Sequence, residues 1–157
     1  MIIGKRSLFT LVMASLPGLV SATLLYAQLG VGTWVRQADA KNPVDITMTV
    51  EPCCNGGRRL TYHIKFGNQT QVMVVESPFN GTAVPVIVDG KPSGETMAIK
   101  QTDSRHWTTT MTMDGKPFGT SSAEISVDGK TLNVENKITF AAAGQSAGVQ
   151  KEVWTKK

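Results

Sequence analysis

The feature that most constrains this chain is the alternation of apolar and polar residues with a period of two. Apolar residues occupy every second position in 44–50 and 60–66, and the residues between them are polar or charged. Trp107, Met111 and Met113 also share one parity, as do Leu132, Val134 and Ile138. Successive side chains of a β-strand point to opposite faces, so each stretch predicts a strand with one buried face. The pattern therefore predicts an all-β protein.

Turn-forming pairs separate the alternating stretches. Three of them are Asp-Gly pairs followed by lysine: Asp89-Gly90, Asp114-Gly115 and Asp128-Gly129. Asp-Gly between alternating runs favours a tight hairpin, because a type I′ turn needs a positive φ at both central residues. We expect an antiparallel up-and-down meander of eight to ten strands. Closure into a barrel removes the exposed edges of such a meander, and a two-layer β-sandwich is the alternative.

The first residues predict an exported protein. Lys5 and Arg6 precede an apolar run over residues 8–29, which is the layout of a secretory signal peptide. We expect the mature protein to be periplasmic or secreted, with no membrane span once the leader is removed.

Two cleavage sites fit the small residues at the end of the apolar run, after Ala22 or after Ala27. We favour Ala27, so that residues 1–27 are the signal peptide and residues 28–157 form one β-barrel domain. An uncleaved membrane anchor is the alternative, since the run is almost long enough to span a bilayer. A Pro-Gly pair at 17–18 interrupts the run and favours cleavage.

The charge pattern argues against a nucleic-acid partner. The chain carries 16 basic and 12 acidic residues, for a formal net charge of +4. Two of the basic residues lie in the leader, and the remainder are scattered rather than gathered in a stripe. Nucleic-acid-binding surfaces usually show such a stripe within a recognisable module.

The start of the mature chain resembles a known family. Gly32-Thr33-Trp34 resembles the Gly-x-Trp signature of lipocalins and related barrels of the calycin group. The resemblance implies that Gly32 and Trp34 are structural, with the tryptophan at the closed end of the barrel against a basic side chain of the last strand. Lys151 is the residue that we expect in that basic role. The chain is also similar to small secreted bacterial lipocalin-like proteins that have no settled function.

The apolar faces suggest a binding site. A barrel of this size can hold one small ligand, and methionine suits irregular cavities. The inward candidates are Met48, Tyr62, Ile64, Phe66, Met73, Trp107, Met111 and Met113. Arg105, or His106 beside it, is the candidate for a polar head group at the rim. We expect a small apolar or amphipathic ligand and no catalysis. The alternative is a cell-envelope interaction module with a filled core and no ligand.

No set of residues predicts catalysis, a metal site or a cofactor. Ser146 lies in a Gly-x-Ser-x-Gly string, but no histidine follows it and no α/β pattern surrounds it. His63 and His106 lie on different predicted strands without a metal-ligand spacing.

Cys53-Cys54 is the unusual local feature, in a turn between two strands. Three interpretations of this pair stay open: a vicinal disulfide, a disulfide-linked dimer, or free thiols able to bind a soft metal. We expect a monomer, with the disulfide-linked dimer as the alternative.

Overall fold

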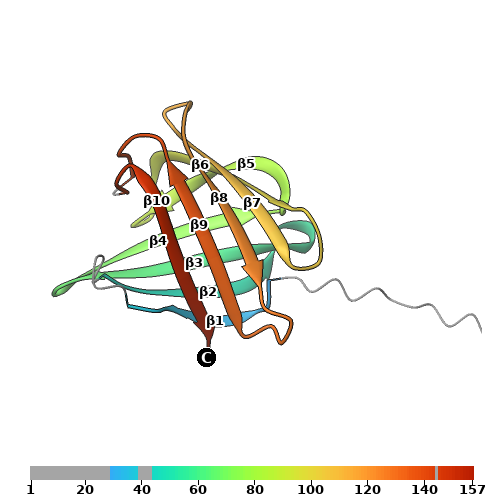
Figure 1. Ribbon diagram of the computed structural model, residues 1–157. Coiled ribbons are helices and arrows are strands. Elements are labelled where there is room, and N and C mark those ends of the chain that lie inside the picture. The colour runs from blue at the N-terminus through green and yellow to red at the C-terminus, as the bar shows by residue number, and fades with distance from the viewer. Residues whose placement is uncertain (1–28, 39–43, 144) are drawn as a thin grey trace, which may run out of the picture.

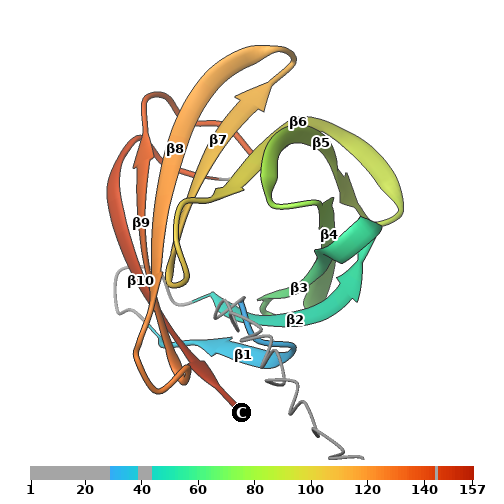
Figure 2. The same ribbon diagram turned by 90° about the vertical axis from the view of Figure 1, so that its right-hand side faces the viewer.

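The chain folds into a closed antiparallel barrel. The computed structural model describes residues 29–38, 44–143 and 145–157. Its strands are β1 (Gly32–Arg36), β2 (Asp45–Cys53), β3 (Gly57–Phe66), β4 (Gln69–Ser77), β5 (Asn80–Val88), β6 (Lys91–Gln101), β7 (His106–Met113), β8 (Lys116–Ile125), β9 (Thr131–Ile138) and β10 (Gly148–Lys156). Each strand pairs with the next, and β1 pairs with β10 to close the ring (Figures 1 and 2). The predicted barrel is confirmed, and the sandwich alternative is wrong.

Two of the three Asp-Gly pairs form the predicted hairpin tips. Asp89 and Asp114 have φ values of 48° and 49°, and the glycine after each is also left-handed. The third pair differs. Only Gly129 has a positive φ there, because β8 ends five residues before β9 begins, and the Ser126 hydroxyl donates a hydrogen bond to Asp128 within a wider loop.

The predicted alternation is visible in the burial of the strands. Leu60 on β3 is buried while Arg59 is exposed, and Leu132 on β9 is buried while Asn133 is exposed. The register keeps inward residues of neighbouring strands opposite one another, as in the pair Leu60 and Val75. The sequence pattern therefore sets the register, because a slip by one residue would turn every apolar side chain outward.

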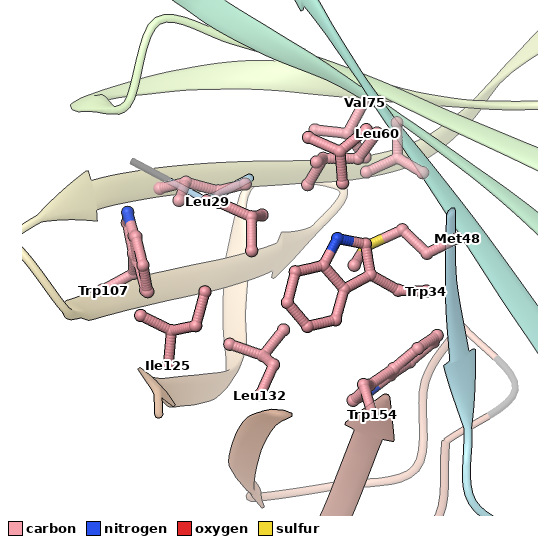
Figure 3. Close-up of a cluster of buried hydrophobic side chains, with 12 residues drawn as sticks. Leu29, Trp34, Met48, Leu60, Val75, Trp107, Ile125, Leu132 and Trp154 are labelled. Atoms are coloured by element: carbon pink, nitrogen blue, oxygen red, sulfur yellow. The ribbon is translucent and has the colours of Figure 1, made fainter. Parts of the chain in front are cut away.

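A hydrophobic core occupies one end of the barrel. We call this the apolar half of the interior. Its members are Leu29, Trp34, Met48, Val50, Leu60, Val75, Val86, Ile99, Trp107, Ile125, Leu132 and Trp154, each at most 6% exposed (Figure 3). Leu29, just before β1, contributes to this cluster and so helps to seal the barrel at this end.

Residues 1–27, the predicted signal peptide, lie outside the described residues. Within the described ranges the structure has no helix with the length and hydropathy needed to cross a bilayer.

Candidate functional site

The other end of the barrel interior is polar. The strand register places Thr109 opposite Ser121, and Ser121 opposite Asn136, on the same face as the buried core residues. Glu95 on β6 and Glu152 on β10 also lie on this inward face, opposite Met113 and Val134. We call this region the polar half of the interior. Its lining comprises Arg36, Tyr62, Met73, Glu95, Met97, Thr109, Ser121, Asn136 and Glu152.

Most side chains of the polar half are only partly buried, although they point inward from the middle of strands. Tyr62, Met97, Thr109, Ser121 and Asn136 all retain accessible surface. A filled core would bury them as fully as the apolar half buries its members. The exposure therefore shows that water reaches these inward side chains.

Glu95 is the most unusual residue of the polar half. It is 4% exposed, and no described polar atom lies within hydrogen-bonding distance of its buried Oε1. Its backbone N–H donates to the Ser93 hydroxyl at 3.2 Å, and that hydroxyl donates to the Val86 carbonyl at 3.0 Å. These bonds fix the backbone but leave the carboxyl group without them. Burial raises the pKa of Glu95 to about 7.

Arg36 and Glu152 form an ion pair that crosses from β1 to β10. Arg36 Nη1 lies 3.3 Å from Glu152 Oε1, and the two side chains are 4% and 20% exposed. Arg36 Nη2 also donates to the Val44 carbonyl, and Trp154 Nε1 donates to Glu152 Oε2 at 3.1 Å. Both charges are therefore compensated within the protein.

Tyr62 lies between the two acidic residues and the apolar half. Its ring meets that of Trp154 edge to face at a centroid distance of 6.1 Å. Burial first, and the nearby carboxyl groups of Glu152 and Glu95 second, raise the pKa of Tyr62 above its ordinary value. The phenol is therefore neutral at physiological pH.

The predicted ligand-binding residues separate into groups. Tyr62, Ile64 and Met73 lie on the inward face of β3 and β4, and Met73 packs against the core from the polar side. Met111 and Met113 lie on β7 in or against a second small cluster with Phe118 and Ile138.

Met48 and Trp107 belong to the apolar half, where they are 2% and 4% exposed. They form the floor of the interior rather than its accessible lining. Phe66 is 50% exposed because it lies beside the β3–β4 turn, past the packed part of the barrel.

Arg105, the residue predicted to meet a polar head group, lies away from the polar half. Arg105 belongs to the β6–β7 connection beside the apolar half, and its Nη2 pairs with Glu124 at 3.1 Å on the outer face. His106 also pairs outside the barrel, with Nδ1 2.8 Å from Asp103 Oδ1. Hydrogen bonds from the Arg105 N–H and the His106 side chain lower the pKa of Asp103.

The residues of the Gly-x-Trp signature are structural. Trp34 is fully buried, and its Nε1 donates to the Gly30 carbonyl at 3.1 Å. Gly32 has a φ of 132°, and a Cβ there would lie 3.1 Å from Lys156 Cε. The ammonium group of Lys156 lies 5.9 Å from the centre of the Trp34 ring.

The role predicted for Lys151 therefore belongs to Lys156. Lys151 has an outward register position on β10, opposite Glu135, and its Nζ lies 3.6 Å from the Glu135 carboxylate. Residue 156 has the opposite side-chain direction because it lies an odd number of positions along the strand, where it pairs directly with Trp34.

The sequence interpretation missed Arg36, Glu95 and Glu152. A signal was available, since each has the parity of an inward apolar neighbour two residues away: Trp34 for Arg36, Met97 for Glu95 and Trp154 for Glu152. A charged residue at an inward parity position marks a buried polar site.

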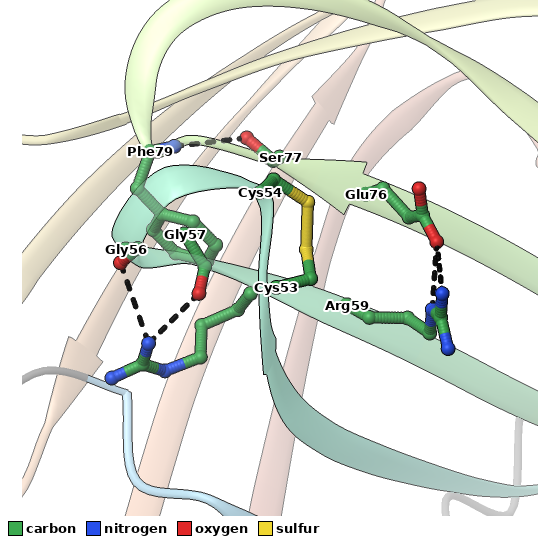
Figure 4. The surroundings of a disulfide bond; sticks show 9 residues. Cys53, Cys54, Gly56, Gly57, Arg59, Glu76, Ser77 and Phe79 are labelled. Atoms are coloured by element: carbon green, nitrogen blue, oxygen red, sulfur yellow. Dashed lines mark hydrogen bonds and ion pairs between the residues drawn. A yellow bond between two sulfur atoms is a disulfide. The ribbon is translucent and has the colours of Figure 1, made fainter.

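The Cys53-Cys54 turn lies beside the apolar half. A short 3₁₀ turn, η1 (Cys54–Gly56), follows Cys53, and the sulfur atoms of these two adjacent cysteines are bonded to each other where the turn begins (Figure 4). Arg59 and Glu76 pair on the outer face nearby, with Arg59 Nε 2.7 Å from Glu76 Oε1. Within the described residues, no group of three His, Cys, Asp or Glu side chains could hold a metal ion.

A hollow of about 100 Å³ lies beside this turn, between Arg58, Phe79 and Trp107. It is separate from the polar half, and none of the carboxyl groups discussed above lines it.

Comparison with known proteins supports the fold. No family model and no curated protein sequence matches the chain. Among solved structures, a mutant of the fluorescent protein UnaG is similar, with a TM-score of 0.58 and 11% sequence identity over 82% of this chain and 96% of that chain. Identity this low shows the fold alone, which is a calycin-type barrel.

Proposed function

We propose that this protein is an exported barrel that binds a small amphipathic molecule in the polar half of its interior. The observation that carries the proposal is the partial exposure of inward side chains in the middle of strands, among them Met97, Thr109 and Asn136. Barrels of this type commonly hold small ligands in their interior or mouth. Methionine and tyrosine would contact the apolar part of the ligand, and the buried polar groups would orient it.

Dye binding tests this proposal. The neutral probe N-phenyl-1-naphthylamine becomes fluorescent in apolar surroundings, so we expect its emission to rise on addition of the protein. Thr109→Phe places a ring in the polar half and should weaken the affinity for the probe at least about tenfold. Thr110→Phe is the matched control, because Thr110 is exposed on the other face of β7.

Equal affinities of the two variants would place the probe outside the barrel. Absence of any fluorescence change with the unmodified protein would contradict the proposal and favour the alternative of a cell-envelope module without a ligand. The second cluster around Phe118 is the feature that favours that alternative, since it fills part of the interior near the β7–β8 turn.

Export is part of the proposal and rests on the sequence of residues 1–27. Mass spectrometry of the mature protein from an expressing cell measures the cleavage site, and we expect the chain to begin at residue 28. The same spectrum, with and without reductant, tests the cysteines. We propose a monomer in which Cys53 and Cys54 are bonded to each other, so reduction should add the mass of two hydrogens. A dimer that reductant separates would contradict this.

A further inference from the structure

The charges inside the polar half do not balance. Arg36 and Glu95 are the two buried charged residues among those described, and Glu152 lies beside them. Arg36 is engaged by Glu152 and by the Val44 carbonyl. Tyr62 contributes no charge. Glu95 is therefore the carboxyl group that the protein leaves uncompensated.

An unpartnered carboxyl group inside a barrel is unfavourable unless something else supplies a donor. A buried polar atom without a hydrogen bond costs roughly 1–3 kcal/mol, and more when it is charged. The backbone of Glu95 is fixed by Ser93, so the residue holds its place on the inward face of β6. Next to it lie soft apolar side chains, with Met113 directly opposite and Met97 two residues along the strand.

We infer that the molecule bound in the polar half carries a cationic amine, which donates a hydrogen bond to the Glu95 carboxyl group while its apolar part lies against the neighbouring methionines. The inference rests on the proposed function and adds the chemical class of the ligand. An ammonium group supplies both the missing donor and the missing positive charge. A carboxylate ligand would meet the like charge of Glu95, and Arg36 is already engaged.

The test compares three probes with the same twelve-carbon chain: dodecylamine, dodecanol and dodecanoate. Each displaces N-phenyl-1-naphthylamine from the full mature chain, and the loss of dye fluorescence gives its affinity. We expect dodecylamine to bind at least about tenfold more tightly than dodecanoate, with dodecanol between them.

Glu95→Gln keeps the size of the side chain and removes its charge. We expect this variant to lose about tenfold more affinity for dodecylamine than for the neutral dodecanol, which has the same chain length. Glu124→Gln is the matched control, because Glu124 lies on the outer face in an ion pair with Arg105. It should leave all three affinities unchanged.

The outcomes separate this inference from the proposed function. If the dye binds but dodecylamine shows no preference over dodecanoate, or if Glu95→Gln leaves the dodecylamine affinity unchanged, the amine inference is wrong and the binding function stands. If neither the dye nor any of the three probes binds, the proposed function fails and the inference fails with it.

Discussion

The two halves of the barrel interior differ in how fully they bury their inward side chains. The apolar half joins side chains from all ten strands into one cluster, in which Trp34, Val50, Val75 and Val86 have no exposed surface. The polar half is built from most of the same strands in the same register, yet most of its side chains stay partly accessible, and they include an unpartnered carboxyl group at Glu95.

The difference indicates that the two halves contribute differently to stability and to function. Burial of apolar area stabilises the barrel at about 25 cal/mol per Å², so the apolar half supplies most of the stability of the fold. The polar half contributes less, and it retains features that a chain selected for stability alone would lose, namely accessible inward side chains and a buried charge. Strained or destabilised sites of this kind are typical of function.

The largest expected effect is in the apolar half. Trp34→Ala removes a fully buried ring and its hydrogen bond to the Gly30 carbonyl, and should lower the free energy of unfolding by about 4 kcal/mol. Met97→Ala, in the partly accessible half, should lower it by no more than about 2 kcal/mol. Urea denaturation of both variants measures the two values. Similar losses would contradict the division between the halves.

Alanine substitutions at two glycines test how rigid the surroundings are in each half. A Cβ at Gly57 would collide with the carbonyl oxygen of Ser77, whereas one at Gly119 would lie 2.8 Å from the Ile138 Cδ1 methyl and 3.1 Å from both the Met111 Cε methyl and the Lys137 carbonyl oxygen. The severe contact at Gly57 is with backbone, which cannot move aside, whereas the shortest contact at Gly119 is with a methyl group at the end of a side chain, which can shift. We expect Gly57→Ala to cost about 3 kcal/mol and Gly119→Ala about 1 kcal/mol. Thermal unfolding measures both, and the reverse order would show that the polar half is the more tightly packed.

Glu95 gives the polar half a pH dependence. The pKa of Glu95 is about 7 in the folded protein, above its value of 4.5 in the unfolded chain. The folded state therefore binds more protons between these two values, so stability falls as the pH rises from about 4.5 to about 7 and then levels off. We expect a loss of about 2 kcal/mol, since water in the interior screens part of the penalty.

Glu95→Gln should remove this loss, so that the variant exceeds the parent protein in stability at pH 8 and not at pH 4. Glu124→Gln should show the parent's pH dependence, because Glu124 is exposed. Urea denaturation at the two pH values measures the difference. A constant difference between Glu95→Gln and the parent across this range would mean that the carboxyl group is hydrated in the folded state.

The sequence predicted the barrel because alternation and turn chemistry act locally. The residues around Asp89 and Asp114 need only their own backbone preferences to form hairpins, and the strands between them bury one parity. Asp128 shows the limit, since a neighbouring serine hydroxyl changed the turn. The basic partner of Trp34 was expected at Lys151 rather than Lys156, because the register of β10 against β1 is set only when the ring closes.

The polar half was less predictable than the fold. Parity alone places Glu95 and Glu152 inside, but whether a charged residue at such a position is paired depends on residues distant in sequence. Arg36 reaches Glu152 across 116 positions of the chain, through the closure of β1 on β10. No local pattern indicates that Glu152 has a partner and Glu95 has none.

The smallest expected effect comes from comparing the same truncation, valine to alanine, at a fully buried position and at a partly accessible one. Val50 lies in the apolar half with no exposed surface, and Val134 lies in the inward row of β9 with part of its surface accessible. Truncation to alanine removes the same atoms at both sites. Val50→Ala should cost about 2 kcal/mol because it leaves a cavity, and Val134→Ala about 1 kcal/mol because its surroundings are already partly open. If urea denaturation gives equal losses, the interior is uniformly packed, and the room that a ligand needs in the polar half is absent.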